Sequence, residues 1–87
     1  MRYHVIGNEV QVKALAEAGL KGDVVCNAEE ARAALGRILA DRSVGTVLVS
    51  SLFHDDPAVS ALIDAHAKTG RLPVIMRLNF PSPGRRS

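Results

Sequence analysis

The fold of this 87-residue chain is decided by the stretch GTVLVS, residues 45–50. This stretch holds the continuous apolar run 46–49, without the alternation of polar and apolar residues that marks a strand with one face in water. The run therefore predicts a central strand of a parallel sheet, covered on both faces. Parallel neighbours are joined by crossover connections, usually helical, so helices are expected before and after it.

Three helices are expected, and the first two carry clear start signals. Asn8 and Gln11 fit a capping box for a helix over residues 9–18, which Gly19 ends as a left-handed residue. Asn27 and Glu30 fit a second box, and the helix that follows has the clearest 3.6-residue period in the chain. Its apolar stripe consists of Ala31, Ala34, Leu35, Ile38 and Leu39.

The third helix is expected from Pro57 to about Lys68, with Asp56 as its cap and Gly70 as its stop. Besides the central strand, short apolar or β-branched runs predict strands at residues 2–7, 23–26 and 72–78. Strands and helices therefore alternate along the chain.

This alternation predicts an α/β fold: a small doubly wound, four-stranded parallel sheet with three helices, of the flavodoxin- or CheY-like type. If the right-handed crossovers place the first two helices on opposite faces of the sheet, the strand order is 2-1-3-4. Residues 1–79 form one domain, and 80–87 form a basic tail containing Pro and Gly. Ligands of such folds bind where the strand order reverses, here between strands 1 and 3. That crevice would be bordered by Asn8, Glu9, Ser50, Ser51 and His54.

The composition excludes several classes of protein. Apolar residues make up 47% and charged residues 23%, no apolar run is long enough to span a membrane or serve as a secretory signal, and the one cysteine has no partner. A cytoplasmic protein is expected. Residues 71–87 carry four arginines and no acid. Contact of Arg85 and Arg86 with nucleic acid is one hypothesis, but three aromatic residues in the whole chain argue against it.

No motif of enzymatic chemistry is found. The chain has neither a G-x-x-x-x-G-K-[ST] loop nor a G-x-G-x-x-G turn to hold a nucleotide. Residues 54–56, His-Asp-Asp, are what a helix start requires, and no second His or Cys stands at metal-ligand spacing. We therefore expect no catalytic residues, no cofactor and no metal.

Six short motifs follow one another along nearly the whole chain. They are VIGNE (5–9), AGL (18–20), EEA (29–31), VGTVLV (44–49), LPVI (72–75) and PS (81–82). In this order the chain resembles the F subunit of V-type and A-type rotary ATPases (ATP synthases). It departs from the family at Asn8 and Arg77, where acidic residues are usual.

The resemblance implies a non-catalytic rotor subunit of the central stalk. Such a protein binds the coiled coil of the D subunit and turns with it inside the A/B catalytic ring, so that ATP hydrolysis or synthesis is coupled to ion transport. It implies a cytoplasmic protein peripheral to the membrane, in the soluble sector of the complex. A small regulatory module that binds an anion or nucleotide in the crevice between strands 1 and 3 is the alternative.

The last strand is the expected docking site, because it is a sheet edge with no helix after it. Met76, Leu78, Phe80 and Pro81 would supply apolar contacts, and Arg77 an ionic contact to an acidic helix of the partner. The opposing interpretation is that Met76 and Leu78 pack against the protein's own helices.

Overall fold

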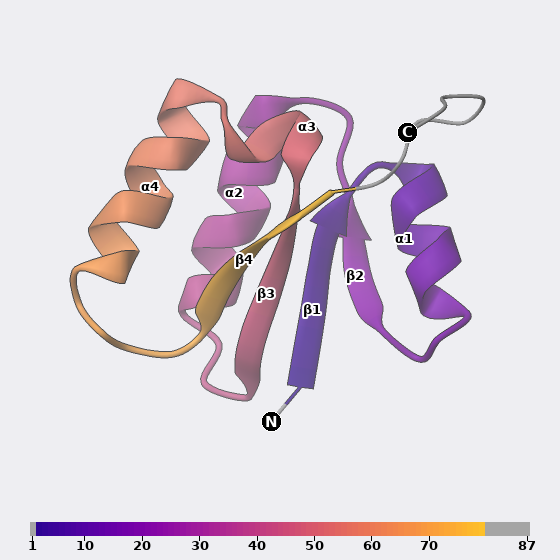
Figure 1. Cartoon of the computed structure of the whole chain (residues 1–87), viewed down its shortest axis with the longest axis horizontal. Coiled ribbons are helices and arrows are strands. Elements are labelled where there is room, and N and C mark those ends of the chain that lie inside the picture. The colour runs from indigo at the N-terminus through magenta and orange to yellow at the C-terminus, as the bar shows by residue number, and fades with distance from the viewer. Residues whose placement is uncertain (1, 80–87) are drawn as a thin grey trace.

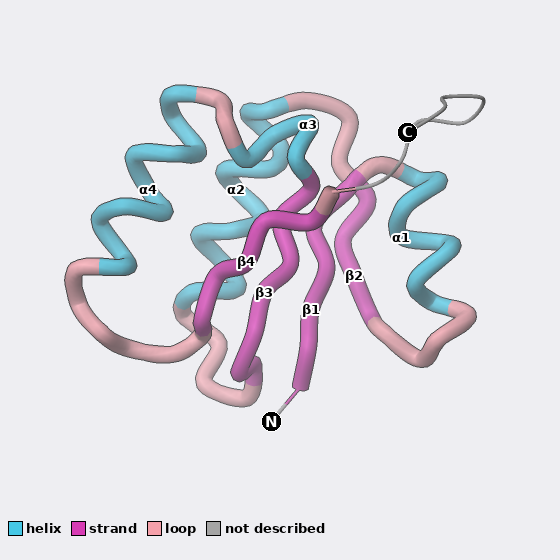
Figure 2. Tube along the Cα trace, viewed as in Figure 1, coloured by secondary structure: helices cyan, strands magenta, loops and turns pink. Residues whose placement is uncertain are grey.

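Strands and helices alternate along the chain in the computed structural model, which describes residues 2–79 (Figures 1 and 2). The elements are β1 (Arg2–Gly7), α1 (Glu9–Ala16), β2 (Lys21–Val24), α2 (Ala28–Leu39), β3 (Val44–Ser50), α3 (Ser51–His54), α4 (Pro57–Ala67) and β4 (Val74–Leu78). All neighbouring strands are parallel, in the order β2-β1-β3-β4. The predicted sheet is confirmed, and α3 is an additional single turn. The proposed tail at 80–87 lies outside the described residues.

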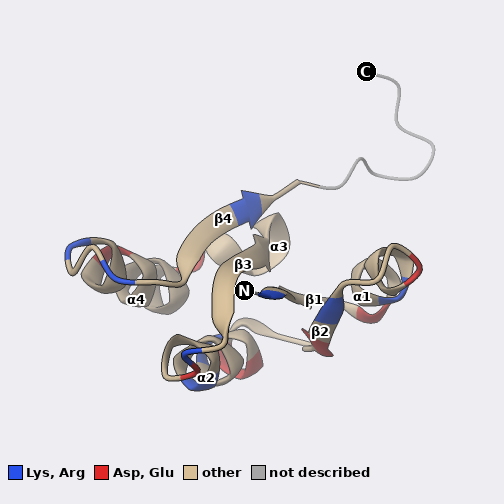
Figure 3. Ribbon diagram, turned by 90° about the horizontal axis from the view of Figure 1, so that it is seen from below, with Lys and Arg blue, Asp and Glu red and all other residues tan. Residues whose placement is uncertain are grey.

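The helices divide unequally between the two faces of the sheet. Helices α2 and α4 pack against each other on one face, whereas α1 lies on the other and contacts β1 and β2 (Figure 3). Right-handed crossovers explain this division, because the chain moves one way across the sheet from β1 to β2 and the opposite way from β2 to β3 and from β3 to β4. None of the helices in the described part of the chain is long and apolar enough to cross a membrane.

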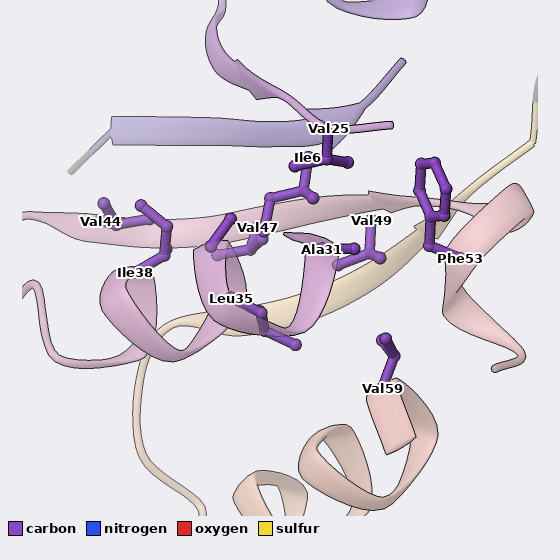
Figure 4. Packing of buried hydrophobic residues seen from close by; sticks show 11 residues of the cluster. Ile6, Val25, Ala31, Leu35, Ile38, Val44, Val47, Val49, Phe53 and Val59 are labelled. Atoms are coloured by element: carbon purple, nitrogen blue, oxygen red, sulfur yellow. The ribbon is translucent and has the colours of Figure 1, made fainter. Parts of the chain in front are cut away.

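The hydrophobic core lies between the sheet and the α2–α4 layer (Figure 4). Ile6 of β1, Val47 of β3 and Leu35 of α2 belong to this core, and all three are fully buried. Burying an aliphatic side chain of this size contributes about 1.5–3 kcal/mol. The amphipathic period of α2, the clearest in the sequence, is therefore the face that seals the sheet.

One residue of β3 interrupts the regular pairing with β1. Arg2 is opposite Val44 but Tyr3 is opposite Thr46, so Gly45 is an extra residue in β3. The irregularity allows both Val44 and Val47, three positions apart, to be buried in the same core. Glycine suits such a site because it tolerates unusual backbone geometry.

The sequence predicted that β3 is covered on both faces, and this prediction is wrong for one of them. Val47 and Val49 are fully buried toward the helices, while Thr46 and Leu48, which alternate with them, are only half-buried. The run is apolar throughout, although only its Val47 and Val49 side packs into the core beneath the helices.

The local helix signals are confirmed with one difference. Asn8 Oδ1 accepts from the Gln11 N–H at 2.9 Å and Gln11 Oε1 accepts from the Asn8 N–H at 3.1 Å, a complete capping box. Asn27 Oδ1 accepts from the Glu30 N–H at 2.8 Å, but the Glu30 carboxylate accepts from the N–H of Cys26 and not of Asn27. The reciprocal bond of the second box is thus displaced by one residue.

The strand boundaries differ from the predicted ones more than the helix starts do. Strand β2 begins at Lys21, two residues before the predicted run, since Gly22 pairs with Val5 of β1. A Cβ at Gly22 would lie 2.6 Å from the Val5 carbonyl oxygen, so only glycine allows this approach. Strand β4 begins at Val74 and not at residue 72, and α1 ends at Ala16 before the left-handed Gly19.

Truncating the centre of this core is expected to destabilise the domain strongly. Leu35→Ala should lower the free energy of unfolding by about 2–5 kcal/mol, because a fully buried leucine leaves a cavity. Val10→Ala, at a side chain that is 69% exposed on α1, should change it by less than about 0.5 kcal/mol. Urea denaturation followed by circular dichroism measures both. Equal effects of the two substitutions would contradict the described core.

Candidate docking face

One face of the sheet carries exposed apolar side chains and no helix over most of its width. We call it the open face: the side of β1, β3 and β4 that points away from α2 and α4. Figure 1 looks onto this side, where β4 crosses in front of α2. It consists of Tyr3, Thr46, Leu48, Val74, Met76 and Leu78.

Strand register assembles these residues into rows across the sheet. Tyr3 pairs with Thr46, which pairs with Val74, and Leu48 pairs with Met76 in the next row. On β4, Ile75 packs against the α2–α4 core, so Val74 and Met76, its neighbours along the strand, project to the other face. Residues from three strands therefore form one continuous surface.

Several apolar side chains of this surface are exposed to solvent. Tyr3 is 54% exposed, Val74 52% and Met76 51%, while Leu48 and Leu78 are half-buried. Single apolar residues on a surface are ordinary, but a contiguous patch marks an interaction site. In contrast, Val5, on the same face where α1 lies over it, is 1% exposed.

The structure separates the residues expected to dock a partner. Alternation along β4 from Ile75, which packs against the core, places Met76 and Leu78 on the open face, and Met76 is 51% exposed. Arg77, between them on β4, projects to the opposite side of the sheet. Phe80 and Pro81 lie outside the described residues.

Three further residues of the open face, Tyr3, Leu48 and Val74, were not singled out in the sequence. The predicted topology could have identified these three residues. The last strand is followed by no helix, and the handedness of the crossovers places two of the three connecting helices on the other face. Together these facts leave one side of strands 1, 3 and 4 uncovered.

Arg77 is engaged within the protein. Its guanidinium donates to Asp55 Oδ2 at 2.7 Å, and His54 Nδ1 lies 3.3 Å from Asp55 Oδ1. The hydrogen bond with His54, with a smaller contribution from the positive charge of Arg77, holds the pKa of the Asp55 carboxyl below its usual value. The pair ties the end of β4 to the turn between α3 and α4, so an ionic contact of Arg77 with a partner would compete with Asp55.

The residues of the alternative crevice do lie at the carboxyl ends of β1 and β3, but most are engaged locally. The Asn8 side chain caps α1, the Ser50 hydroxyl accepts from the first turn of α3 at 3.2 Å, and Glu9 forms an i,i+4 ion pair within α1 at 3.3 Å. Ser50 is fully buried and Ser51 begins α3. His54 is the Asp55 neighbour described above. Asn8, Glu9 and Ser50 thus use side-chain hydrogen bonds or charge within their own segments.

Metal-binding groups do not gather in the part of the chain that the structure describes. Across residues 2–79, no three His, Cys, Asp or Glu side chains are placed to hold an ion together. Cys26 is exposed. The open face is thus the surface that combines area, exposure and apolar character.

The ion pair of Arg77 leads to a prediction about titration. Arg77→Gln should raise the pKa of Asp55 toward its ordinary value, since it removes a positive charge and a donor from the carboxylate. Because the pKa is depressed in the folded protein, the small stabilisation from this group is present above the unfolded-state pKa and is lost as pH falls through the folded-state pKa. NMR titration of the Asp55 carboxyl carbon measures the shift. Lys13→Gln, on α1, is the control and should leave that pKa unchanged.

Comparison with known proteins identifies a family for this fold and surface. Residues 4–86 match the family model described as ATP synthase (F/14-kDa) subunit. Searches of curated proteins and of solved structures found no match. The matched range spans nearly the whole sequence and reaches into every strand and helix. The chain therefore belongs to the ATP synthase (F/14-kDa) subunit family, the F subunits of V/A-type ATPases.

Proposed function

We propose that this chain is a non-catalytic component of the central stalk, which binds the coiled coil of the D subunit and turns with it as part of the rotor. In this role it couples ATP hydrolysis or synthesis in the A/B ring to ion transport without reacting with ATP itself. It acts in the soluble sector of the complex, on the cytoplasmic side and peripheral to the membrane. Family membership and the open face support this proposal.

The observation that carries the proposal is the size and chemistry of the open face. Neighbouring strands are about 4.8 Å apart, so β1, β3 and β4 together span about 10 Å. An α-helix with its side chains is about 10–12 Å in diameter. The face therefore has the width of one helix of a coiled coil, and its half-exposed Tyr3, Val74 and Met76 supply an apolar centre.

The surroundings of the open face also suit a helical partner. Fully desolvated apolar side chains at the centre of an interface, inside a polar rim, provide most of the binding energy. Helix α1 stands at one border and presents the exposed ion pair Lys13–Glu9. The other border is β4. An adapter needs such a surface and does not need a substrate pocket.

The occupied crevice at the strand ends supports the non-catalytic part of the proposal. Phosphate-binding folds present free backbone N–H groups of a glycine-rich loop at this position. Here the Asn8 side chain caps α1 by accepting from the Gln11 N–H, and the sequence has no phosphate-binding lysine motif. ATP chemistry is therefore assigned to other subunits of the complex.

Co-expression with the D subunit of the same rotary ATPase tests the proposal. The wild-type chain should co-elute with the D subunit in size-exclusion chromatography, and Met76→Glu should weaken the complex by about tenfold or more, because it places a charge in the apolar centre. Met76→Leu should retain binding. Isothermal titration calorimetry of the two purified proteins gives the affinities.

Ala61→Glu is the matched control, since it introduces the same charge at an exposed position of α4, on the other side of the sheet. It should bind the D subunit as the wild type does. Two folded proteins that elute separately at micromolar concentration would refute the rotor assignment. Equal loss of binding by the α4 and β4 variants would refute the open face as the contact.

A further inference from the structure

A second surface lies along the outer edge of β4 and shares only Val74 with the open face. A half-open cavity of about 290 Å³ separates this edge from the last turns of α4. We call it the edge groove. Its main lining residues are Ile63, Ala67, Arg71, Leu72, Val74 and Ile75.

The apolar character of the edge groove comes from both of its walls. Ile63 and Ala67 line it from α4, and Leu72 and Val74 line it from the chain that enters β4. Leu72 is 49% exposed and Val74 52%. His66 Nε2 lies 2.8 Å from the Pro73 carbonyl oxygen, a hydrogen bond that fixes the start of β4 against α4. The groove is therefore held open by the fold.

The edge of β4 offers hydrogen-bonding groups as well as apolar contact. Within the described residues, β4 pairs with β3 on one side and with no strand on the other. Backbone N–H and C=O groups along such an edge are a template for another extended chain. A strand added here would lie directly over the groove, so that its alternate side chains would point into it.

The charge around the edge groove is positive. Arg71 lines the groove, and Arg42 stands beside it in an adjoining depression that shares Arg71 and Leu72. Among the described residues, neither arginine has a carboxylate within 4.0 Å. Strand β4 has no acidic residue. A second copy of this chain would thus bring no complementary charge in its own β4.

We propose that the edge groove binds an extended acidic peptide segment of a partner protein, which adds a strand to β4. An apolar side chain of the segment fills the space between Ala67 and Leu72, and its carboxylates meet Arg71 and Arg42. Main-chain hydrogen bonds provide affinity in this mode of recognition, and the pocket and charges provide specificity. The inference does not depend on the contact with the D subunit, because that contact is centred on Tyr3 and Met76 of the open face, and Val74 is the one residue named in both surfaces.

The probe for this proposal is a fluorescein-labelled octapeptide of alternating valine and glutamate. It should bind saturably in fluorescence anisotropy at low ionic strength and weaken as salt is added, since exposed charges attract it. In ¹⁵N-correlated NMR spectra the largest shifts should fall on β4 and on the last two turns of α4. A matched peptide with lysine in place of glutamate should not bind.

Two variants and one control locate the site. Arg71→Glu should weaken peptide binding by about tenfold or more, because it reverses a charge at the groove. Ala67→Phe should weaken it by filling the apolar space while leaving the charge unchanged. Arg32→Glu, the same charge change on an exposed position near the start of α2, should leave the affinity within about twofold.

Several results would overturn the proposal. They are the absence of saturable binding, NMR shifts confined to the open face, and equal weakening by the α2 control and the groove variants. Concentration-dependent dimerisation that Ala67→Phe abolishes would assign the groove to a second copy of the chain and not to an acidic partner. All variants are compared by circular dichroism to confirm that they are folded.

Discussion

Parallel strands must be joined by crossovers, and the handedness of the crossover decides on which face of the sheet each connecting helix lies. In this protein the chain moves in one direction across the sheet from β1 to β2, and in the opposite direction from β2 to β3 and from β3 to β4. Two helices, α2 and α4, consequently share one face, and α1 stands alone on the other. The position of the core and the open face are both consequences of this asymmetry, and the edge of β4 follows from its terminal place in the strand order.

The asymmetry leaves a small domain with apolar surface that its own helices do not cover. A domain of this size buries only about 60–65% of the surface that its unfolded chain exposes, so each buried contact matters to its stability. Tyr3, Val74 and Met76 nevertheless remain about half exposed. This exposed surface suits the helical partner proposed above for this member of the ATP synthase (F/14-kDa) subunit family.

The starts of the helices could be predicted because the signals are local. Asn8, Asn27 and Asp56 each cap the helix predicted for them, since the side-chain oxygen and the N–H that it accepts from are two or three residues apart. Strand boundaries could not be predicted as well. The start of β2 depends on the fit of Gly22 against Val5, a contact between residues 17 positions apart in the sequence.

The order of amino acids was enough to specify the alternation of strands and helices and the polarity of α2, because periodicity and caps depend on neighbouring residues. The strand order followed only once the first two crossovers were taken to lie on opposite faces of the sheet. Packing in three dimensions was needed to establish which side chains of β4 face outward and that Arg77 is paired with Asp55, on the other side of the sheet from Met76. A strand's period of two assigns its residues to two faces, but which face is covered depends on helices from elsewhere in the chain.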